Sequence, residues 1–487
     1  MDTVGGITYF GEVTLKGKKV RFGIKDADRL ERMCLIGRND AGREWHIVNS
    51  VLADAERGRG VLVLDGFGKL SEMLIERLPV EARERLVYLD PSDAEYPFAF
   101  NALVAFRALP EEAALPLLSD AIASLYRAKT SPLIEWAARF LYRNESATFI
   151  ALYELTAEPY MRDRTFGTDA ALQKEFESLL ANDAETADAV RQNGRYLAKD
   201  TLVRNLIGQI ESKLDFEQFQ AGMIIVLDLS RIRMFPTRIA PLSRLFVHAL
   251  RAHAAHLNDT PALYIHECLR AFSESDVTRL FSERTIMTLL SDSATTEADW
   301  NLRKVALSRS GTVIAYAPSG EEATDAAELF FPYVTIEDLE KLESEESVVM
   351  LAIDSVRSRP FFARTLPIKG RESVSYHDIQ MFSRNRYATS RRSVDTIFAK
   401  RYAPPSREAR PGTDPGSFSN AFRSIFARNA QGGTRPPGAP AAPLPPPPSR
   451  IPPPPPPPPK ADANKKPAEI PEEELKKMLH VDPMPEK

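Results

Sequence analysis

Five short runs of almost continuous apolar residues most constrain how this chain can fold. Strands covered on both faces in a parallel sheet have this character, whereas half-exposed strands alternate apolar and polar residues. Helical stretches separate the runs along the 487 residues. This alternation is typical of a parallel α/β sheet with helices on both faces. The runs are RMCLIG (32–37), GVLVLD (60–65), MIIVLDL (223–229), ALYIHE (262–267) and GTVIAYA (311–317).

The segments between these runs predict how the rest of the chain is organised. GITYFGEVTLKGKKVRFGI precedes the first run and alternates apolar with polar residues, which predicts an edge hairpin. From Glu111 onward, Leu, Ala, Glu and Arg recur at helical spacing, which predicts an all-α insertion. The predicted parts are the hairpin with the first part of the core (1–104), the insertion (105–219), the second part of the core (220–370), a basic closing segment (371–403) and a tail (404–487).

Proline marks the start of the tail. Of 38 prolines, 24 follow Ala403, and a segment of this kind cannot bury enough apolar surface to offset its chain entropy. We therefore expect 404–487 to be disordered and partly polyproline II. Two short helical islands interrupt it, SFSNAFRSIFARN and IPEEELKKMLHVD. They are either docking peptides that fold on a protein partner or transient helices without one, and the sequence leaves both open.

The composition, with 43% hydrophobic and 27% charged residues, is that of a soluble globular protein. No run reaches the roughly 18 apolar residues of a membrane helix, and the N-terminus lacks a signal-peptide profile, so we expect a cytoplasmic protein. Cys34 and Cys268 are the only cysteines, which excludes a disulfide framework and a cysteine metal cluster. We expect no resident metal site. A net charge of −4 argues against a surface that binds nucleic acid throughout, but it allows a local basic strip.

Residues 37–44 have the spacing of a phosphate-binding loop. Such a loop follows GxxxxGK[ST] between a strand and a helix, because backbone N–H groups, the lysine and the hydroxyl converge on phosphate and Mg²⁺. Here Arg43 stands at the lysine position, Glu44 stands at the hydroxyl position and Asp40 adds a negative charge. These residues alone leave open an altered nucleotide loop and an ordinary strand-turn-helix. The loop residues are Gly37, Arg38, Asn39, Asp40, Ala41, Gly42, Arg43 and Glu44.

Carboxylates at the ends of two further runs are the other candidates for a site. Asp65 ends the second run, where an acid either lines a ligand crevice or serves a turn with Gly66. The fourth run ends in His266 and Glu267. A nucleotide hydrolase would place two carboxylates there, to hold Mg²⁺ and to orient water. Histidine is a poor ligand for Mg²⁺.

The order of these segments resembles that of a known family, the HerA/FtsK class of P-loop motors, and most closely its TraD-like coupling proteins of type IV secretion and conjugation. In that family a hairpin leads into the phosphate loop, a second strand and a segment similar to RLVYLDPSDAEYPFAFNAL (85–103). After an all-α insertion the family returns with a stretch like TLVRNLIGQIESKLDFEQFQAGMIIVLDL (201–229). The stretches GTVIAYAPSGEEATDAAELFFPYVTIEDLEKL, PFFARTLPI and SRNRYATSRRSVDTIFAKRY are similar to its closing segments. The resemblance covers about residues 5–402 and implies a RecA-like P-loop core.

The departures from this family fall on the residues that carry its chemistry. Arg43 and Glu44 replace the loop lysine and hydroxyl, and His266 replaces the first acid of an Asp-Glu pair, so that Glu267 remains as a remnant of the catalytic pair. Together these losses imply that ATP hydrolysis is lost or strongly impaired, since one arginine finger alone can contribute about 10³–10⁵ in rate. The other departures are Asp65-Gly66-Phe67-Gly68 for an Asp-Pro-His-Gly turn, Asp292 and Ser293 for a glutamine sensor, and Ala317 or Pro318 for the arginine of a Phe-Arg-like pair.

By resemblance, the cofactors are ATP and Mg²⁺, and the partners are DNA and type IV secretion or motor subunits, commonly in a hexameric ring at the inner face of the membrane. We favour a DNA- or partner-binding subunit without hydrolysis. The alternatives are an active DNA-translocating ATPase, in which Arg43 grips phosphates and Glu267 orients water, and a scaffold that binds partners through its proline runs without nucleic acid. A basic strip is either a DNA contact or a solvated helix face; its residues are Arg384, Arg386, Arg391 and Arg392.

Overall fold

The computed structural model of the chain describes residues 6–15, 17–38, 42–78, 84–214, 219, 222–257, 260–280, 285–290, 296–368 and 375–402. Several predictions made above fall outside these residues. They concern Asn39, Asp40 and Ala41 of the loop, Asp292 and Ser293, and the tail 404–487 with its two helical islands.

A parallel sheet forms the centre of the fold, and its strands run in the order β9-β3-β8-β7-β4-β6-β5. All five predicted runs are strands of this sheet, and each is buried along its whole length, as expected of strands with helices on both faces. Two short strands, β5 and β8, were not among the predicted runs. The strands are β3 (Met33–Gly37), β4 (Val61–Asp65), β5 (Leu86–Leu89), β6 (Ile224–Asp228), β7 (Ala262–His266), β8 (Ile286–Leu290) and β9 (Thr312–Tyr316).

Four antiparallel strands extend the sheet beyond β9 in the order β10-β13-β1-β2. The predicted N-terminal hairpin is β1 (Ile7–Leu15) with β2 (Lys18–Lys25), and it lies at this edge of the sheet. Its neighbours β10 (Glu346–Met350) and β13 (Phe361–Thr365) were not predicted as strands. A separate small ribbon consists of β11 (Ala352–Ile353) and β12 (Val356–Arg357).

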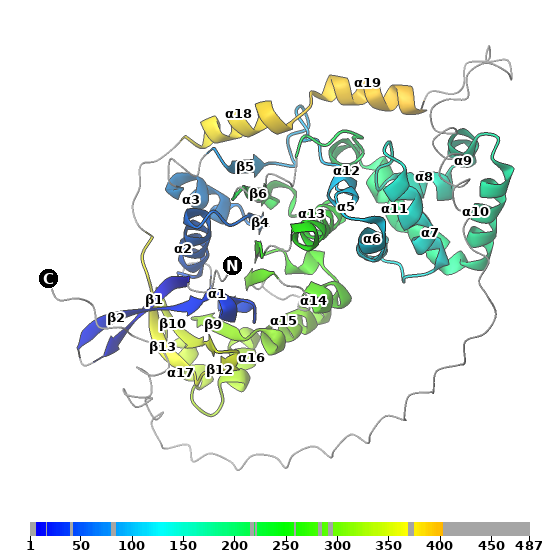
Figure 1. The fold of residues 1–487 in the computed structure, drawn as a ribbon. Helices are drawn as coiled ribbons and strands as arrows, with labels where there is room; N and C mark the ends of the chain where they lie inside the picture. The colour runs from blue at the N-terminus through cyan, green and yellow to red at the C-terminus, as the bar shows by residue number, and fades with distance from the viewer. Residues whose placement is uncertain are drawn as a thin grey trace, which may run out of the picture.

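Helices cover both faces of the sheet, with α2 and α3 on one side and α13 to α16 on the other (Figure 1). Because parallel strands alternate with helices in this way, the predicted α/β fold, a mostly parallel sheet with helices on both faces, is confirmed. No helix in the described part of the chain combines the length and the apolar character that a membrane span requires. The helices around the sheet are α1 (Asp26–Arg29), α2 (Arg43–Glu56), α3 (Lys69–Arg77), η2 (Ser230–Ile232), α13 (Pro236–Leu257), η3 (Leu269–Ala271), α14 (Glu274–Leu280), α15 (Glu297–Arg309), α16 (Glu321–Phe330) and α17 (Ile336–Glu340).

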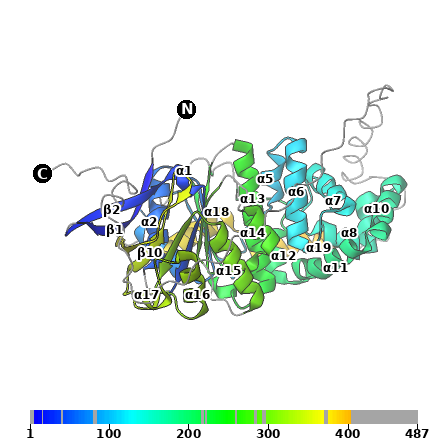
Figure 2. The same cartoon turned by 90° about the horizontal axis from the view of Figure 1, so that it is seen from below.

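The predicted all-α insertion follows β5 and projects to one side of the sheet (Figures 1 and 2). The described residues between β5 and β6 form no strand. An aromatic group around Trp136, with Phe140, Phe166 and Phe176 beside it, fills part of its core. The helices are α5 (Leu103–Arg107), α6 (Glu111–Tyr126), α7 (Pro132–Arg143), α8 (Ala151–Ala157), α9 (Pro159–Phe166), α10 (Ala170–Asn182), α11 (Ala184–Lys199) and α12 (Thr201–Ile207).

Two C-terminal helices, α18 (Tyr376–Tyr387) and α19 (Arg391–Tyr402), run from the β5 edge of the sheet to the insertion (Figure 1). On α18 the Ser383 hydroxyl accepts a hydrogen bond from the Tyr88 amide of β5 at 2.9 Å. On α19 the Arg401 guanidinium pairs with Glu154 of α8 at 2.8 Å. The basic closing segment therefore ties the insertion to the sheet.

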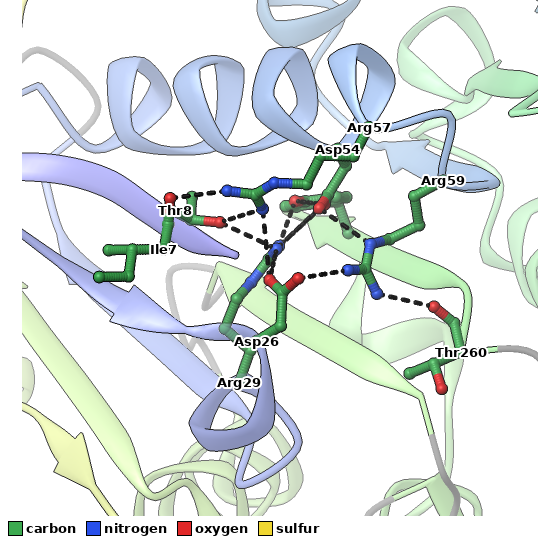
Figure 3. A network of polar contacts seen from close by, with 9 residues as sticks. Ile7, Thr8, Asp26, Arg29, Asp54, Arg57, Arg59 and Thr260 are labelled. Atoms are coloured by element: carbon green, nitrogen blue, oxygen red, sulfur yellow. Dashed lines mark hydrogen bonds and ion pairs between the residues drawn. The ribbon is translucent and has the colours of Figure 1, made fainter. Parts of the chain in front are cut away.

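A buried ion-pair network joins the hairpin region to the core (Figure 3). Arg29 of α1 donates two hydrogen bonds to Asp54 of α2, at 2.7 and 2.8 Å, and one to the Tyr264 hydroxyl of β7 at 2.8 Å. Burial opposes ionisation of Asp54, but Arg29 holds the pKa of this carboxyl below its ordinary value. Asp26 and Arg59 extend the network towards solvent. The helices α1 and α2 and the distant strand β7 thus share one buried polar network.

Removing one partner of this network should destabilise the protein strongly. Asp54→Asn removes the nearer counter-charge of the buried Arg29 guanidinium and leaves Asp26 at 3.4 Å, and we expect a loss of about 3–5 kcal/mol in the free energy of unfolding. The measurement is urea-induced unfolding followed by circular dichroism. Asp188→Asn removes the acid of an exposed pair with Arg191 and should cost less than about 1 kcal/mol. Equal losses in the two variants would contradict a structural role for the network.

Candidate nucleotide site

The candidate phosphate loop joins β3 to α2 through two glycines with left-handed backbone. Gly37 has φ 120° and Gly42 has φ 91°, a conformation that other residues rarely adopt. A Cβ atom at position 37 would lie 1.9 Å from the carbonyl oxygen of Tyr316 at the end of β9, so a side chain cannot fit there. Gly42 is the N-terminal cap of α2. Strand, glycine, glycine and helix therefore follow one another in the structure as in a nucleotide-binding loop.

The Arg43 side chain turns back into this loop. Its Nη1 donates to the carbonyl oxygen of Gly37 at 2.7 Å, its Nε to Glu44 at 3.1 Å and its Nη2 to Glu267 at 2.5 Å. The side chain is only 2% exposed. All three nitrogens of the guanidinium are thus used inside the protein, and the side chain connects the last part of the loop to its first residue.

Glu44, which stands at the hydroxyl position, is buried together with His266. The His266 Nε2 lies 3.7 Å from a Glu44 oxygen, an ion-pair distance, and the Nδ1 is 2.7 Å from Asp65. Burial lowers the pKa of His266, but Asp65 and Glu44 outweigh burial and raise this pKa to about 9. Burial likewise opposes ionisation of Glu44, and yet His266 and Arg43 hold the pKa of its carboxyl below the ordinary value. A protonated His266 therefore bridges two buried carboxylates, through a hydrogen bond to Asp65 and an ion pair with Glu44 in which the Nε2 has no hydrogen-bond partner among the described residues.

Asp65 organises the turn after β4. One carboxylate oxygen accepts hydrogen bonds from the amides of Phe67 and Gly68, at 3.0 and 2.9 Å, and the other accepts from the amide and hydroxyl of Ser71, both at 2.7 Å. The side chain is fully buried. Burial raises the pKa of this carboxyl, and His266 with these donors lowers it below the ordinary value overall. Asp65 thus has protein partners on both oxygens, which supports its turn role more than a role in holding a ligand.

Further acids surround the loop. Glu267 directly follows β7 with φ 53°, and the left-handed backbone there directs its side chain to Arg43. Glu322, in the first turn of α16, lies near the amide of Gly37. Burial raises the pKa of Glu322, although this amide and the arginines Arg303 and Arg43 act in the opposite direction. Sequence reasoning missed Glu322, because nothing in the sequence distinguishes it from the adjacent Glu321.

This arrangement does not fit a nucleoside triphosphate with Mg²⁺. Polyphosphate requires free positive charge and amide donors, whereas Arg43 is already neutralised by Glu44 and Glu267. Pulling Arg43 away from these acids would leave buried charges unpaired, which costs about 3–5 kcal/mol. Among the described residues, no group of three or more His, Cys, Asp or Glu side chains is arranged to hold a metal ion.

The other predicted site positions lie apart from this cluster or carry no charge. Ala317 has φ 42° directly after β9, and both Ala317 and Pro318, the two candidates for the arginine position, are buried and uncharged. Of the basic strip, Arg384 pairs with Asp93 at 2.6 Å, and Arg391 pairs with Glu95 at 3.2 Å. These acids compete with any phosphate for the two arginines. A DNA contact through this strip stays a prediction.

Neither a protein-family model nor a curated protein matches the sequence. Solved proteins that are similar in structure to this chain include two kinds. One is the bacterial conjugative coupling protein TrwBdeltaN70, with 12% sequence identity over 75% of this chain and 90% of that one and a TM-score of 0.47. The plasmid coupling protein TrwB in complex with ADP and Mg²⁺ has 11% sequence identity over 73% of this chain and 90% of that one, with a TM-score of 0.46. The other is VirB4 of Thermoanaerobacter pseudethanolicus, with 12% identity over 78% of this chain and 99% of that chain and a TM-score of 0.46.

The His266 bridge predicts a loss of stability at high pH. With a folded pKa of about 9 and an unfolded value of about 6.5, the bridge contributes on the order of 3 kcal/mol below pH 6.5. The folded state holds the proton more tightly, so this contribution disappears as the pH rises through 9. We expect the free energy of unfolding, measured in urea, to fall more between pH 6 and pH 10 in the natural protein than in His266→Gln. The exposed His377 gives a control, because His377→Gln should keep the natural pH dependence. Identical pH dependence in His266→Gln and the natural protein would exclude the bridge.

Proposed function

We propose that this chain is a coupling-protein-like P-loop subunit of a type IV secretion or conjugative DNA-transfer system, and that it does not hydrolyse ATP. It would act at the cytoplasmic face of the membrane by contacting DNA or partner subunits, including active motor subunits in a shared ring. The collinear resemblance over about residues 5–402 supports the biological setting, and the parallel sheet with its all-α insertion is compatible with it.

The internal pairing of Arg43 carries the proposal. A catalytic lysine must reach the β- and γ-phosphates of a nucleotide, but the corresponding arginine contacts Gly37, Glu44 and Glu267 of its own chain. Glu267 could orient a water molecule only if it were released from Arg43. One salt bridge therefore occupies both the cation and the acid that an active enzyme would need.

Hydrolysis of Mg·ATP by the full chain, with and without single-stranded DNA, tests the proposal. We expect no turnover above background, because Arg43, the cation at the lysine position, is held by Glu44 and Glu267 and does not reach the transition-state charge. Glu267→Gln should behave as the natural protein does.

Glu340→Gln, an exposed change on α17, serves as the matched control. Turnover that survives in Glu340→Gln but is lost in Glu267→Gln would show an active site built on Glu267. In that case the chain would be a DNA-translocating ATPase, and the proposal would be wrong.

A further inference from the structure

Two adjacent turns at the carboxyl edge of the sheet expose large apolar side chains. One turn follows β4 and carries Phe67, which is 40% exposed; the other follows β6 and carries Met234 and Phe235, which are 78% and 48% exposed. Most large apolar side chains of a monomeric protein are buried, and a group of exposed ones marks an interaction site.

The same turns carry a concentration of positive charge. Residues 229–238 read LSRIRMFPTR, with three arginines and no acid. The guanidinium carbon of Arg233 lies 5.3 Å from the centre of the Phe67 ring, and that of Arg238 lies 4.4 Å from the centre of the Phe235 ring. Within the described residues, Arg233 has no acidic partner. The residues Phe67, Arg231, Arg233, Met234, Phe235 and Arg238 are called the arginine–aromatic cluster below.

The two turns are held rigidly against each other. The amide of Leu229 donates to the carbonyl oxygen of Asp65 at 2.8 Å, and Asp228 accepts from both the amide and the hydroxyl of Ser230, at 3.0 and 2.6 Å. A Cβ atom on Gly68 would lie 2.8 Å from the Ser230 hydroxyl, so the turns are in close contact. The cluster is therefore preorganised, which reduces the entropy lost when a ligand binds.

We propose that the arginine–aromatic cluster binds single-stranded nucleic acid. Its arginines would contact the phosphates, and unpaired bases would stack on Phe67 and Phe235, the combination that proteins use for single strands without sequence preference. This inference deepens the proposed function and rests on its DNA-contacting part. Residues 229–238 contain no acid, and Arg233 is exposed there, which favours a polyanion over a protein of mixed charge, although Arg231 and Arg238 already have acidic partners in Asp90 and Asp200.

A comparison of the ion pairs in the basic strip with those in the arginine–aromatic cluster supports the cluster as the binding surface. In the basic strip of α18 and α19, Arg384 and Arg391 are held by Asp93 and Glu95. In the cluster, Arg238 pairs with Asp200 at 2.7 Å, and Arg231 pairs with the buried Asp90 at 3.1 Å although its own side chain is 55% exposed. Arg233 is exposed beside the Phe67 ring and has no acidic partner among the described residues. A phosphate can therefore approach Arg233 without displacing an acid.

Fluorescence anisotropy of a labelled oligothymidine of about 16 nucleotides with the full chain tests the inference, at about 50 and 200 mM salt. Phe67→Ala and Phe235→Ala should each weaken binding at low salt by at least about fivefold, through loss of base stacking. Arg233→Ala should reduce the slope of log affinity against log salt by about 0.7, the value for one phosphate on a single strand. Arg233→Lys should keep that slope.

A matched arginine–aromatic pair elsewhere provides the control. Arg359 lies 5.6 Å from the ring centre of Tyr333, and the double variant Tyr333→Ala/Arg359→Ala should bind as the natural protein does. Absence of binding at low salt, or unchanged affinity in all three cluster variants, would overturn the inference. So would a change of oligomeric state in those variants, measured by light scattering, because the cluster would then be a protein contact. The binding assay contains no ATP. A failure of the oligothymidine to bind is therefore distinguishable from ATP turnover in the hydrolysis test, which would contradict the proposed function.

Discussion

Because Arg43 is buried, its positive charge must be balanced by nearby acids, and the residues around it form a connected set of ion pairs. A guanidinium that is 2% exposed needs counter-charges, and Glu44 and Glu267 supply them. Buried Glu44 in turn needs His266, and protonated His266 needs Asp65. Asp65 then fixes the turn after β4 by accepting four hydrogen bonds from it. Through these contacts Arg43 is connected to the ends of three strands of the sheet, β3, β4 and β7.

These contacts lie within a backbone that has the spacing of a phosphate-binding loop. It has the left-handed glycines at 37 and 42 and the turn between β4 and α3. Internal ion pairs engage the side chains of Arg43, Glu44 and Glu267. The turn that Asp65 organises also presents Phe67 beside Arg233, so the same chain of contacts shapes the proposed surface for single strands.

The sequence predicted the scaffold better than the site. Fully apolar runs such as GVLVLD identified the central strands, because burial on both faces leaves a strong local signal. β13 is a short strand that is buried at its ends and mostly exposed between them, and β1, one of its two pairing partners, lies far away in the sequence, so no run of apolar residues revealed it. The sequence shows that Arg43 and Glu44 stand at the lysine and hydroxyl positions of the loop pattern. It does not show where the Arg43 side chain points, because that depends on Glu267, 224 positions away. Which carboxylate meets which cation is decided by tertiary packing.

The most direct test of this account is isothermal titration of Mg·ATP into the full chain and into Arg43→Lys/Glu44→Thr, which restores the residue types of a functional loop. The control, Glu76→Thr/Arg77→Lys, makes the same pair of changes on α3, where Glu76 is exposed. The account predicts no binding by the natural protein or the control, and binding by the restored variant. Saturable binding by the natural protein, unimproved in the restored variant, would contradict it.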